Sequence, residues 1–279
     1  MNTINPYNNK NVLVSKNDIQ NILKKYDIFQ NITNLSIYQE AFIHQSYTIP
    51  YIKNVMERDN VNLVSNIDGF AQLQPKSYET LEYLGDAVIE LIISNYLYRR
   101  FPNESEGFLS RLRVSLVNRM ALSHLSKILG LNKYLVISKT LEEKEDGRLK
   151  VSHLEDIFEA FIGAIFKDFN VVNSGFGFQI AETFLINLIE DEKSEIDITA
   201  LIMDDGNYKT KIVKYYRQVY KTNISFKIID TDGSSGLKNF LVYVYRDDIR
   251  KKLGEGNGID KKDAIQNASK NALNNQGLM

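Results

Sequence analysis

The sequence has no cysteine and only three histidines, His44, His124 and His153, among its 279 residues. The absence of cysteine excludes disulfides, thiolate zinc sites, iron–sulfur clusters and thiol catalysis. A metal site in this chain must therefore be built mainly from carboxylates. Carboxylate ligands favour hard cations such as Mg²⁺ over zinc.

Long apolar runs are also lacking. No stretch approaches the roughly 18 apolar residues that a membrane-spanning helix needs. Residues 1–5 show no export pattern of charged, then apolar, then small residues. We therefore expect a soluble intracellular protein without a membrane partner, located in the cytoplasm, or in the host cytoplasm if the source is a virus.

The net charge is close to zero but unevenly distributed. The chain has a formal charge of −1, with 43% hydrophobic and 25% charged residues, as in ordinary globular proteins. Residues 207–279 hold 14 Lys and Arg against 7 Asp and Glu, a net charge of +7, which leaves 20 against 28, or −8, for residues 1–206. This division predicts that the basic part binds a polyanion and that the acidic part binds something that neutralises carboxylates.

Helical periodicity dominates residues 18–192. Apolar residues recur at helical spacing from residue 18 and over 38–45, 78–101, 109–129, 152–168 and 177–190. These segments predict an all-α domain over residues 18–192. We expect the asparagine-rich residues 1–17 to form a flexible arm, and residues 51–76 to form a surface insertion with at most one helical turn.

A different pattern follows a predicted linker at residues 193–206. The expected elements are a helix, two strands, a glycine-rich turn and a final helix, at 209–220, 224–228, 240–245, 254–258 and from 261 onward. With one further strand, this order predicts a small α+β domain of α-β-β-β-α type over residues 207–279.

Three acids form a stripe on the helix expected at 78–101. Glu79, Glu82 and Asp86 stand at i, i+3 and i+7, so they fall within a stripe roughly 60° wide on the helix surface. Like charges at this spacing repel by a few tenths of a kcal/mol per pair. Helix stability alone would not select the stripe, whereas a bound cation would make it favourable.

A second acidic pair, Asp156 and Glu159, is spaced i, i+3 on a helix whose other residues are nearly all apolar. Such a helix should be buried, and buried carboxylates are costly unless they are paired or metal-bound. Gly85 on the first helix and Gly163 on the second would allow a close approach, so that four carboxylates converge on one divalent ion. The alternative is a solvated acidic face with Lys or Arg partners.

Four segments resemble motifs of the ribonuclease III family. Residues 78–88, YETLEYLGDAV, resemble the family signature ERLEFLGDA, and residues 154–164, LEDIFEAFIGA, resemble its second acidic motif. Residues 40–47, EAFIHQSY, and 106–113, EGFLSRLR, are similar to two further family elements. In order and spacing, the four segments cover most of residues 18–190.

The resemblance implies a divalent-metal endonuclease that cuts double-stranded RNA as a homodimer. It implies Mg²⁺ as the cofactor, with Mn²⁺ as a substitute, and products with 5′-phosphates, 3′-hydroxyls and short 3′ overhangs. The metal ligands implied by the match are Glu82, Asp86, Asp156 and Glu159. The two outer acids of the catalytic valley would be Glu79 and Glu106. Tyr83 stands where the family usually has a phenylalanine that inserts into the partner subunit.

The competing interpretation is a non-catalytic dimeric protein that binds and sequesters double-stranded RNA. Such a protein would have no reason to keep the six acids of the family motifs, and all six are present. We therefore favour the enzyme.

The end of the chain resembles a double-stranded RNA-binding domain. Residues 256–264, GNGIDKKDA, are similar to the GxGxSKKxA turn of these domains, which would place Lys261 and Lys262 at a helix N-terminus facing phosphates. On the first helix of the domain, the resemblance implies that Lys209 and Lys211 contact RNA.

Several positions depart from that pattern. Asp260 replaces the usual serine, and Val213 and Lys214 stand where glutamine and glutamate usually contact the minor groove. The loop at 233–236 lacks the customary proline and histidine. These departures predict weaker, strongly salt-dependent RNA binding by the domain.

The insertion at residues 51–76 is longer than the connection in most bacterial relatives. Together with the richness in Asn, Ile and Lys, it resembles ribonuclease III enzymes of giant DNA viruses such as mimivirus. A duplex-contacting arm, a dimer element and a simple loop are all compatible with its sequence.

Overall fold

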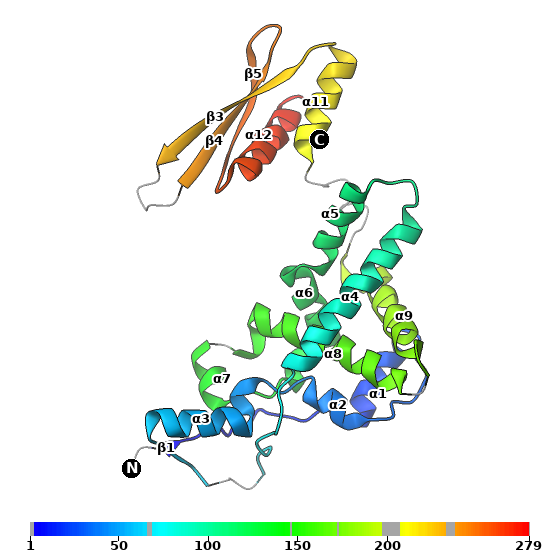
Figure 1. The fold of residues 1–279 in the computed structure, drawn as a ribbon, viewed down its shortest axis with the longest axis vertical. Coiled ribbons are helices and arrows are strands. Elements are labelled where there is room, and N and C mark those ends of the chain that lie inside the picture. The colour runs from blue at the N-terminus through cyan, green and yellow to red at the C-terminus, as the bar shows by residue number, and fades with distance from the viewer. Residues whose placement is uncertain are drawn as a thin grey trace. The chain divides into compact units, whose positions relative to one another are not determined.

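The computed structural model describes residues 3–65, 69–145, 147–171, 173–196, 207–232 and 238–278. Contacts divide the chain into two compact units, Met1–Asp197 and Ile198–Met279 (Figure 1). In its described residues the first unit is predominantly helical, and the second has α-β-β-β-α order. The predicted fold class is therefore confirmed.

The first unit is built from helices of one to six turns. They are α1 (Lys16–Lys24), α2 (Leu35–Glu40), α3 (Ile49–Asp59), α4 (Glu79–Arg100), α5 (Glu106–Val117), α6 (Arg119–Leu129), α7 (Lys139–Glu145), α8 (Val151–Asn170) and α9 (Phe176–Glu190). A two-residue parallel pair, β1 (Thr3–Ile4) and β2 (Asn62–Leu63), joins the chain start to the insertion.

Helix α8 lies at the centre of the first unit. It packs against α4, α6 and α9, with α4 running alongside it (Figure 1). Ile157, Phe158 and Phe161 on this helix are fully buried. The apolar residues of α8 thus form the core, as predicted. A polar side chain on this helix needs a hydrogen-bond partner, an ion-pair partner or a bound cation inside that core.

The predicted single helix at 109–129 is wrong, because Asn118 divides it into α5 and α6. The Asn118 side chain accepts a hydrogen bond from the Ala121 backbone N–H at 3.0 Å, which caps the start of α6. Its amide nitrogen also donates to the carbonyls of Val114 and Ser115, at 3.2 and 2.9 Å, and closes α5. One polar side chain therefore satisfies backbone groups of both helices.

Residues 3–14 pack onto the body, so the predicted flexible arm at 1–17 is wrong in its described part. Tyr7, Asn8 and Val14 are buried. The side-chain amides of Asn8 and Asn11 donate to the Ile137 carbonyl at 3.3 and 2.9 Å. Asparagine richness suggested a loose segment, but these asparagines satisfy a backbone carbonyl far along the chain.

The insertion at 51–76 also holds more structure than one helical turn. Helix α3 has three turns, begins beneath the Thr48 cap and buries Ile52 and Val55. The chain then forms β2 against β1. Residues 66–68 of the insertion lie outside the described residues.

The second unit packs two helices on a three-stranded antiparallel sheet. Its elements are α11 (Tyr208–Val219), β3 (Ile224–Asp232), β4 (Lys238–Arg246), β5 (Lys251–Gly258) and α12 (Lys261–Asn275), with strand order β3-β4-β5. Val242 and Val244 on β4 face Ala264, Ala268 and other small or apolar residues in its core.

The glycine-rich segment at 254–258 is the end of strand β5 and not the predicted turn. A Cβ on Gly256 would lie 2.2 Å from the Ala268 nitrogen of α12, so only glycine allows the strand and helix backbones to meet. The glycines serve close packing against α12.

Part of the predicted linker at 193–206 belongs to the first unit. Ser194 is buried, and its hydroxyl donates to the Ile189 carbonyl at 2.9 Å. Residues 197–206 lie outside the described residues. In the described portions of the chain, we find no helix with the length and apolar character required to cross a membrane.

Candidate active site

The acidic stripe of α4 faces α8 across a seam in which the two backbones touch. A Cβ on Gly85 would lie 1.8 Å from the Glu159 carbonyl oxygen, and one on Gly163 would lie 2.3 Å from the Leu81 carbonyl oxygen. Neither position can hold a larger residue without separating the helices. The close approach expected from these two glycines is therefore present, and it brings the acids that flank them on both helices near one another.

The Glu159 carboxyl group shows the electrostatic cost of this arrangement most clearly. Burial raises its pKa to about 8, and repulsion by Asp86, Glu155 and Glu82 contributes in the same direction. Asp86 and Glu82 belong to α4, so the repulsion acts across the seam. A carboxyl group in this state is stabilised by a proton or by a cation.

Glu82 shows the reciprocal effect. Burial raises its pKa to about 7, followed by repulsion from Asp156 on α8 and Glu79 on its own helix. Acids of α4 and α8, about 70 residues apart in sequence, therefore share one electrostatic site. We call this site the acid cluster and define it as Glu82, Asp86, Asp156 and Glu159.

Asp156 is held by a tyrosine that the sequence motifs did not single out. The Tyr78 hydroxyl, at the start of α4, donates to Oδ2 of Asp156 at 3.0 Å, and the Tyr78 ring is buried. Burial raises the pKa of Asp156, while this hydrogen bond opposes the change. Tyr78 stands at i−4 from Glu82, on the same helix face, and that spacing could have identified it.

Another acid of α8, Asp168, shows what a structural carboxylate looks like in this fold. It is fully buried and accepts hydrogen bonds from the Thr33 and Asn34 backbone nitrogens at 3.1 and 2.9 Å and from the Tyr38 hydroxyl at 3.1 Å. Among the described residues, Glu159 accepts no comparable bond. The two acids of one helix therefore differ in kind: one is satisfied by the protein, and the other is not.

The alternative of a solvated acidic face with basic partners does not describe the acid cluster. The nearby Arg119, at the start of α6, forms its ion pair with Glu155. None of the four cluster acids forms a salt bridge within the described parts of the chain. Arg119 therefore attracts Asp156 and lowers its pKa, but its ion pair is with Glu155.

The donor set fits a hard divalent cation. All four cluster groups are carboxylates, which are oxygen ligands of the kind that Mg²⁺ prefers. As their side chains are placed, no three His, Asp or Glu residues of the described chain are gathered tightly enough to hold one ion together. Holding a cation jointly would therefore require rotation of these flexible side chains.

Of the two outer acids implied by the resemblance, Glu79 lies beside the cluster. It acts on the pKa of Glu82, and its carboxylate accepts a hydrogen bond from the Ser77 hydroxyl at 2.7 Å.

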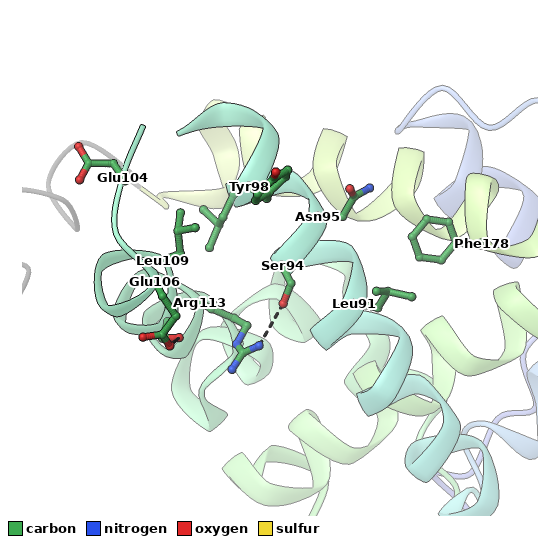
Figure 2. A pocket seen from close by; sticks show the side chains of 11 residues that line it. Leu91, Ser94, Asn95, Tyr98, Glu104, Glu106, Leu109, Arg113 and Phe178 are labelled. Atoms are coloured by element: carbon green, nitrogen blue, oxygen red, sulfur yellow. Dashed lines mark hydrogen bonds between the residues drawn. The ribbon is translucent and has the colours of Figure 1, made fainter. Parts of the chain in front are cut away.

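Glu106 lies elsewhere in the chain, in a cavity of about 610 Å³ between α4 and α5. Figure 2 shows it at the start of α5 beside Arg113, whose guanidinium donates to the Ser94 hydroxyl at 3.1 Å. Leu91, Tyr98 and Phe178 give this cavity an apolar wall (Figure 2). Within one chain, the structure does not bring Glu106 into the acid cluster.

Tyr83 projects from α4 with 82% of its surface exposed.

Two histidines pack behind the site. The His44 and His153 rings lie 4.8 Å apart, and His44 also contacts the Tyr78 ring at 5.8 Å. Nδ1 of His44 bonds to the Ser46 hydroxyl and that of His153 to the Gly147 carbonyl. Both rings support the wall that holds Tyr78.

In the second unit, the four predicted RNA-contacting lysines lie in the first turns of the two helices. Lys261 and Lys262 begin α12, where Asp260 caps the helix by accepting from the Asp263 nitrogen at 2.8 Å. Lys209 and Lys211 begin α11. The loop at 233–236 lies outside the described residues.

Comparison with known proteins identifies the family. The Ribonuclease III domain profile matches residues 79–170. A probable ribonuclease 3 of Acanthamoeba polyphaga mimivirus is 35% identical over 271 residues, which is 96% of this chain but 47% of the viral protein, so the chain spans about half of that relative. Ribonuclease 3 of Sulfurovum sp. is 32% identical over 220 residues, 79% of this chain and 93% of the bacterial one.

Among solved structures, the nuclease domain of ribonuclease III from Campylobacter jejuni matches at 27% identity with a TM-score of 0.46, covering 63% of this chain and 94% of that domain. Since the chain covers nearly all of a ribonuclease 3 with which it shares 32% identity, and three of the four motif segments that resembled this family fall within or at the edge of residues 79–170, it belongs to the ribonuclease III family of endoribonucleases that act on double-stranded RNA.

Proposed function

We propose that the chain is a Mg²⁺-dependent endoribonuclease that hydrolyses double-stranded RNA to products with 5′-phosphates, 3′-hydroxyls and short 3′ overhangs. The observation that carries this proposal is the acid cluster. Glu159 and Glu82 have pKa values raised to about 8 and about 7 by burial and mutual repulsion, while the nearby arginine is committed to Glu155.

In this proposal the four cluster carboxylates would bind the cation. Neighbouring residues position these carboxylates. When bound, a divalent cation supplies a water of lowered pKa and neutralises charge that develops at the phosphodiester. Tyr78 donates to one oxygen of Asp156 and so limits its rotation. Arg119 forms an ion pair with Glu155 and so offsets the charge of an acid that repels Glu159. Gly85 and Gly163 keep the two helices at contact distance.

We further propose that residues 18–192 form the catalytic domain and residues 207–279 hold the duplex. The second unit has the strand order and the helix-terminal lysines that such a role needs. We retain the prediction that its RNA contacts are weak and salt-dependent.

The active form in this proposal is a homodimer through the catalytic domain. Tyr83 is 82% exposed, and Leu91 and Tyr98 on the same helix are 58% and 68% exposed. Leu91 and Tyr98 also line the apolar cavity of about 610 Å³, which offers a seat for an aromatic side chain of a partner. Replacement of Tyr83 by alanine should lower the dimer fraction in analytical ultracentrifugation, whereas the exposed Phe29, remote in sequence on the α1–α2 connection, provides a matched Phe29→Ala control.

The test of the enzymatic proposal is cleavage of a labelled RNA duplex by the full chain with Mg²⁺ and with a chelator. We expect cleavage only with the metal. Asp86→Asn and Glu159→Gln should each abolish cleavage while duplex binding in a gel-shift assay is largely retained. Glu57→Gln, at an exposed acid on α3, is the control and should cleave normally. Duplex that is bound but uncut by the wild-type chain would favour the sequestering protein instead.

A further inference from the structure

The insertion forms one wall of a groove that Glu79, the neighbour of the acid cluster, also lines. The groove has a volume of about 480 Å³ and lies between α3 and the segment that leads into α4. Its polar lining includes Gln45, Tyr51, Asn54, Lys76, Glu79 and Thr80. We call it the α3 groove.

The walls of the α3 groove are fixed by backbone hydrogen bonds. The Ile49 nitrogen donates to the Gln74 carbonyl at 2.8 Å, and the Gln74 nitrogen donates to the Tyr47 carbonyl at 3.1 Å. Pro50 and Pro75 both line the groove, and each restricts its own backbone. A groove with walls of this kind exists before a ligand arrives, which lowers the entropy cost of binding.

Glu79 connects the groove with the candidate active site. It lines the groove and stands one turn before Glu82 on α4. Residues at i and i+3 on a helix are neighbours, with Cβ atoms about 5 to 6 Å apart. A ligand that fills the α3 groove therefore lies next to the acid cluster.

The lining suits a ribose-phosphate unit better than an apolar ligand. Lys76 offers an exposed ammonium group, and Asn54 offers an exposed amide that can both donate and accept. Within the described residues neither side chain forms a hydrogen bond or ion pair. Tyr51 is 39% exposed, and its ring is a flat surface of the kind that packs against a sugar.

We propose that the α3 groove binds one nucleotide of the RNA strand next to the bond that is cut, with Lys76 on a phosphate, Asn54 on the ribose 2′-hydroxyl and Tyr51 against the sugar. The inference rests on the proposed function and assigns a role to the insertion. It makes α3 a part of the substrate-binding surface of this chain.

The test compares four variants of the full chain in cleavage of one labelled duplex. Lys76→Ala should raise KM about fivefold, as expected for one lost contact of about 1 kcal/mol, and should lower the slope of log KM against log salt by about one. Tyr51→Ala and Asn54→Ala should raise KM severalfold, with kcat unchanged in all three. Lys53→Ala, an exposed lysine on the same helix that does not line the groove, is the matched control and should retain KM and most of the slope.

A second measurement assigns the contact to one nucleotide. Duplexes carrying a single 2′-deoxy substitution at successive positions near the cut should show a cleavage defect at one position with the wild-type chain. That defect should disappear in Asn54→Ala, because the side chain that reads the hydroxyl is gone. Wild-type KM and salt slope in all three groove variants, or a deoxy profile unchanged by Asn54→Ala, would overturn the proposal. A wild-type chain that does not cut duplex RNA would instead overturn the proposed function.

Discussion

In both units of this protein, glycines allow two elements to pack in backbone contact, but the contact has a different role in each unit. In the first unit Gly85 and Gly163 bring two helices into backbone contact. In the second, Gly256 on β5 meets Ala268 on α12 just as closely. The groups that flank the contact differ: carboxylates surround the helix seam, whereas the sheet–helix contact lies in an apolar core.

The difference shows what close packing contributes in each place. At the β5–α12 contact it adds apolar burial to a small domain that has little core to spare. At the α4–α8 seam, close packing keeps acids near one another although they repel. The repulsion lowers the free energy of unfolding of this unit. Sites that work against stability in this way are typical of catalytic centres.

Breaking the helix seam should have the largest effect. Gly85→Ala places a methyl group 1.8 Å from a backbone oxygen, so we expect a loss of about 3 kcal/mol or more in the free energy of unfolding and a fall in Tm of about 10 °C. Duplex cleavage should fall more than a hundredfold. Gly107→Ala on α5, where the new Cβ would meet only the Arg111 side chain at 3.4 Å, should leave both properties unchanged. Equal effects of the two substitutions would contradict the seam.

Breaking the sheet–helix contact should damage only the second unit. Gly256→Ala would place a Cβ 2.2 Å from the Ala268 nitrogen, and we expect fast hydrogen exchange across residues 207–278 while residues 79–170 stay protected. Cleavage should continue at low salt and fall severalfold at high salt, because duplex binding is weakened. Loss of protection in both units would show that they do not fold independently.

Removing the Tyr78 hydroxyl tests the support of the acid cluster. Tyr78→Phe leaves the ring in place but frees Asp156, and we expect kcat to fall about tenfold, as for other residues that orient a metal ligand, with a shift to higher Mg²⁺ requirement. Tyr38→Phe removes an equally buried hydroxyl from the structural Asp168. Tyr38→Phe should lower Tm without changing the Mg²⁺ dependence of cleavage. If Tyr78→Phe also lowered Tm and left the Mg²⁺ dependence unchanged, Tyr78 would serve folding alone.

The raised pKa values predict how stability depends on pH. In the unfolded chain Glu159 ionises near its ordinary pKa of 4.5, but in the folded protein its pKa is about 8. The free energy of unfolding should therefore be highest below pH 4.5 as far as this group is concerned, and should fall as pH rises through 8.

The measurement is Tm in the presence of a chelator at several pH values. Glu159→Gln should be more stable than wild type at pH 9, by about 1 to 2 kcal/mol after allowance for solvent screening, and equal to it near pH 4. Added Mg²⁺ should raise the Tm of the wild type more than that of the variant. A variant less stable than wild type at pH 9 would show that Glu159 has a favourable partner.

The smallest effect concerns the basic second unit. Lys261→Ala should weaken duplex binding by about threefold and lower the salt slope by about one, as for a single phosphate contact. Lys227→Ala on β3, away from the helix N-termini, should keep the wild-type slope. If Lys227 mattered more than Lys261, the duplex would contact the sheet and not the helix ends.

Helix ends were predicted where a proline or a capping residue marks them in the sequence. Pro102 places the end of α4 near residue 101, and the helix ends at Arg100. Asp260 was expected to cap the last helix, and it does so. The division at Asn118 was missed because apolar periodicity continues through it, and only its side-chain bonds to both helices separate them.

The packing of residues 3–14 was missed for another reason. Asn8 and Asn11 bond to a carbonyl more than 120 residues away, and no local pattern reports a partner at that distance. The same holds for Tyr78 and Asp156, which meet across 78 positions of sequence.

By itself the sequence determined the available chemistry: three acids on one face of a helix, a second pair on an apolar helix, glycines that allow the two helices to meet, no cysteine and only three histidines. These properties follow from composition and residue spacing, because residues three or four positions apart lie on the same face of a helix. Tertiary structure alone decided which acids share a site, since it brought Asp156 and Glu159 of α8 beside Glu82 of α4 and left Glu106 in another cavity. It also gave the insertion a wall of the α3 groove, because contacts between distant segments arise only when the core closes around them.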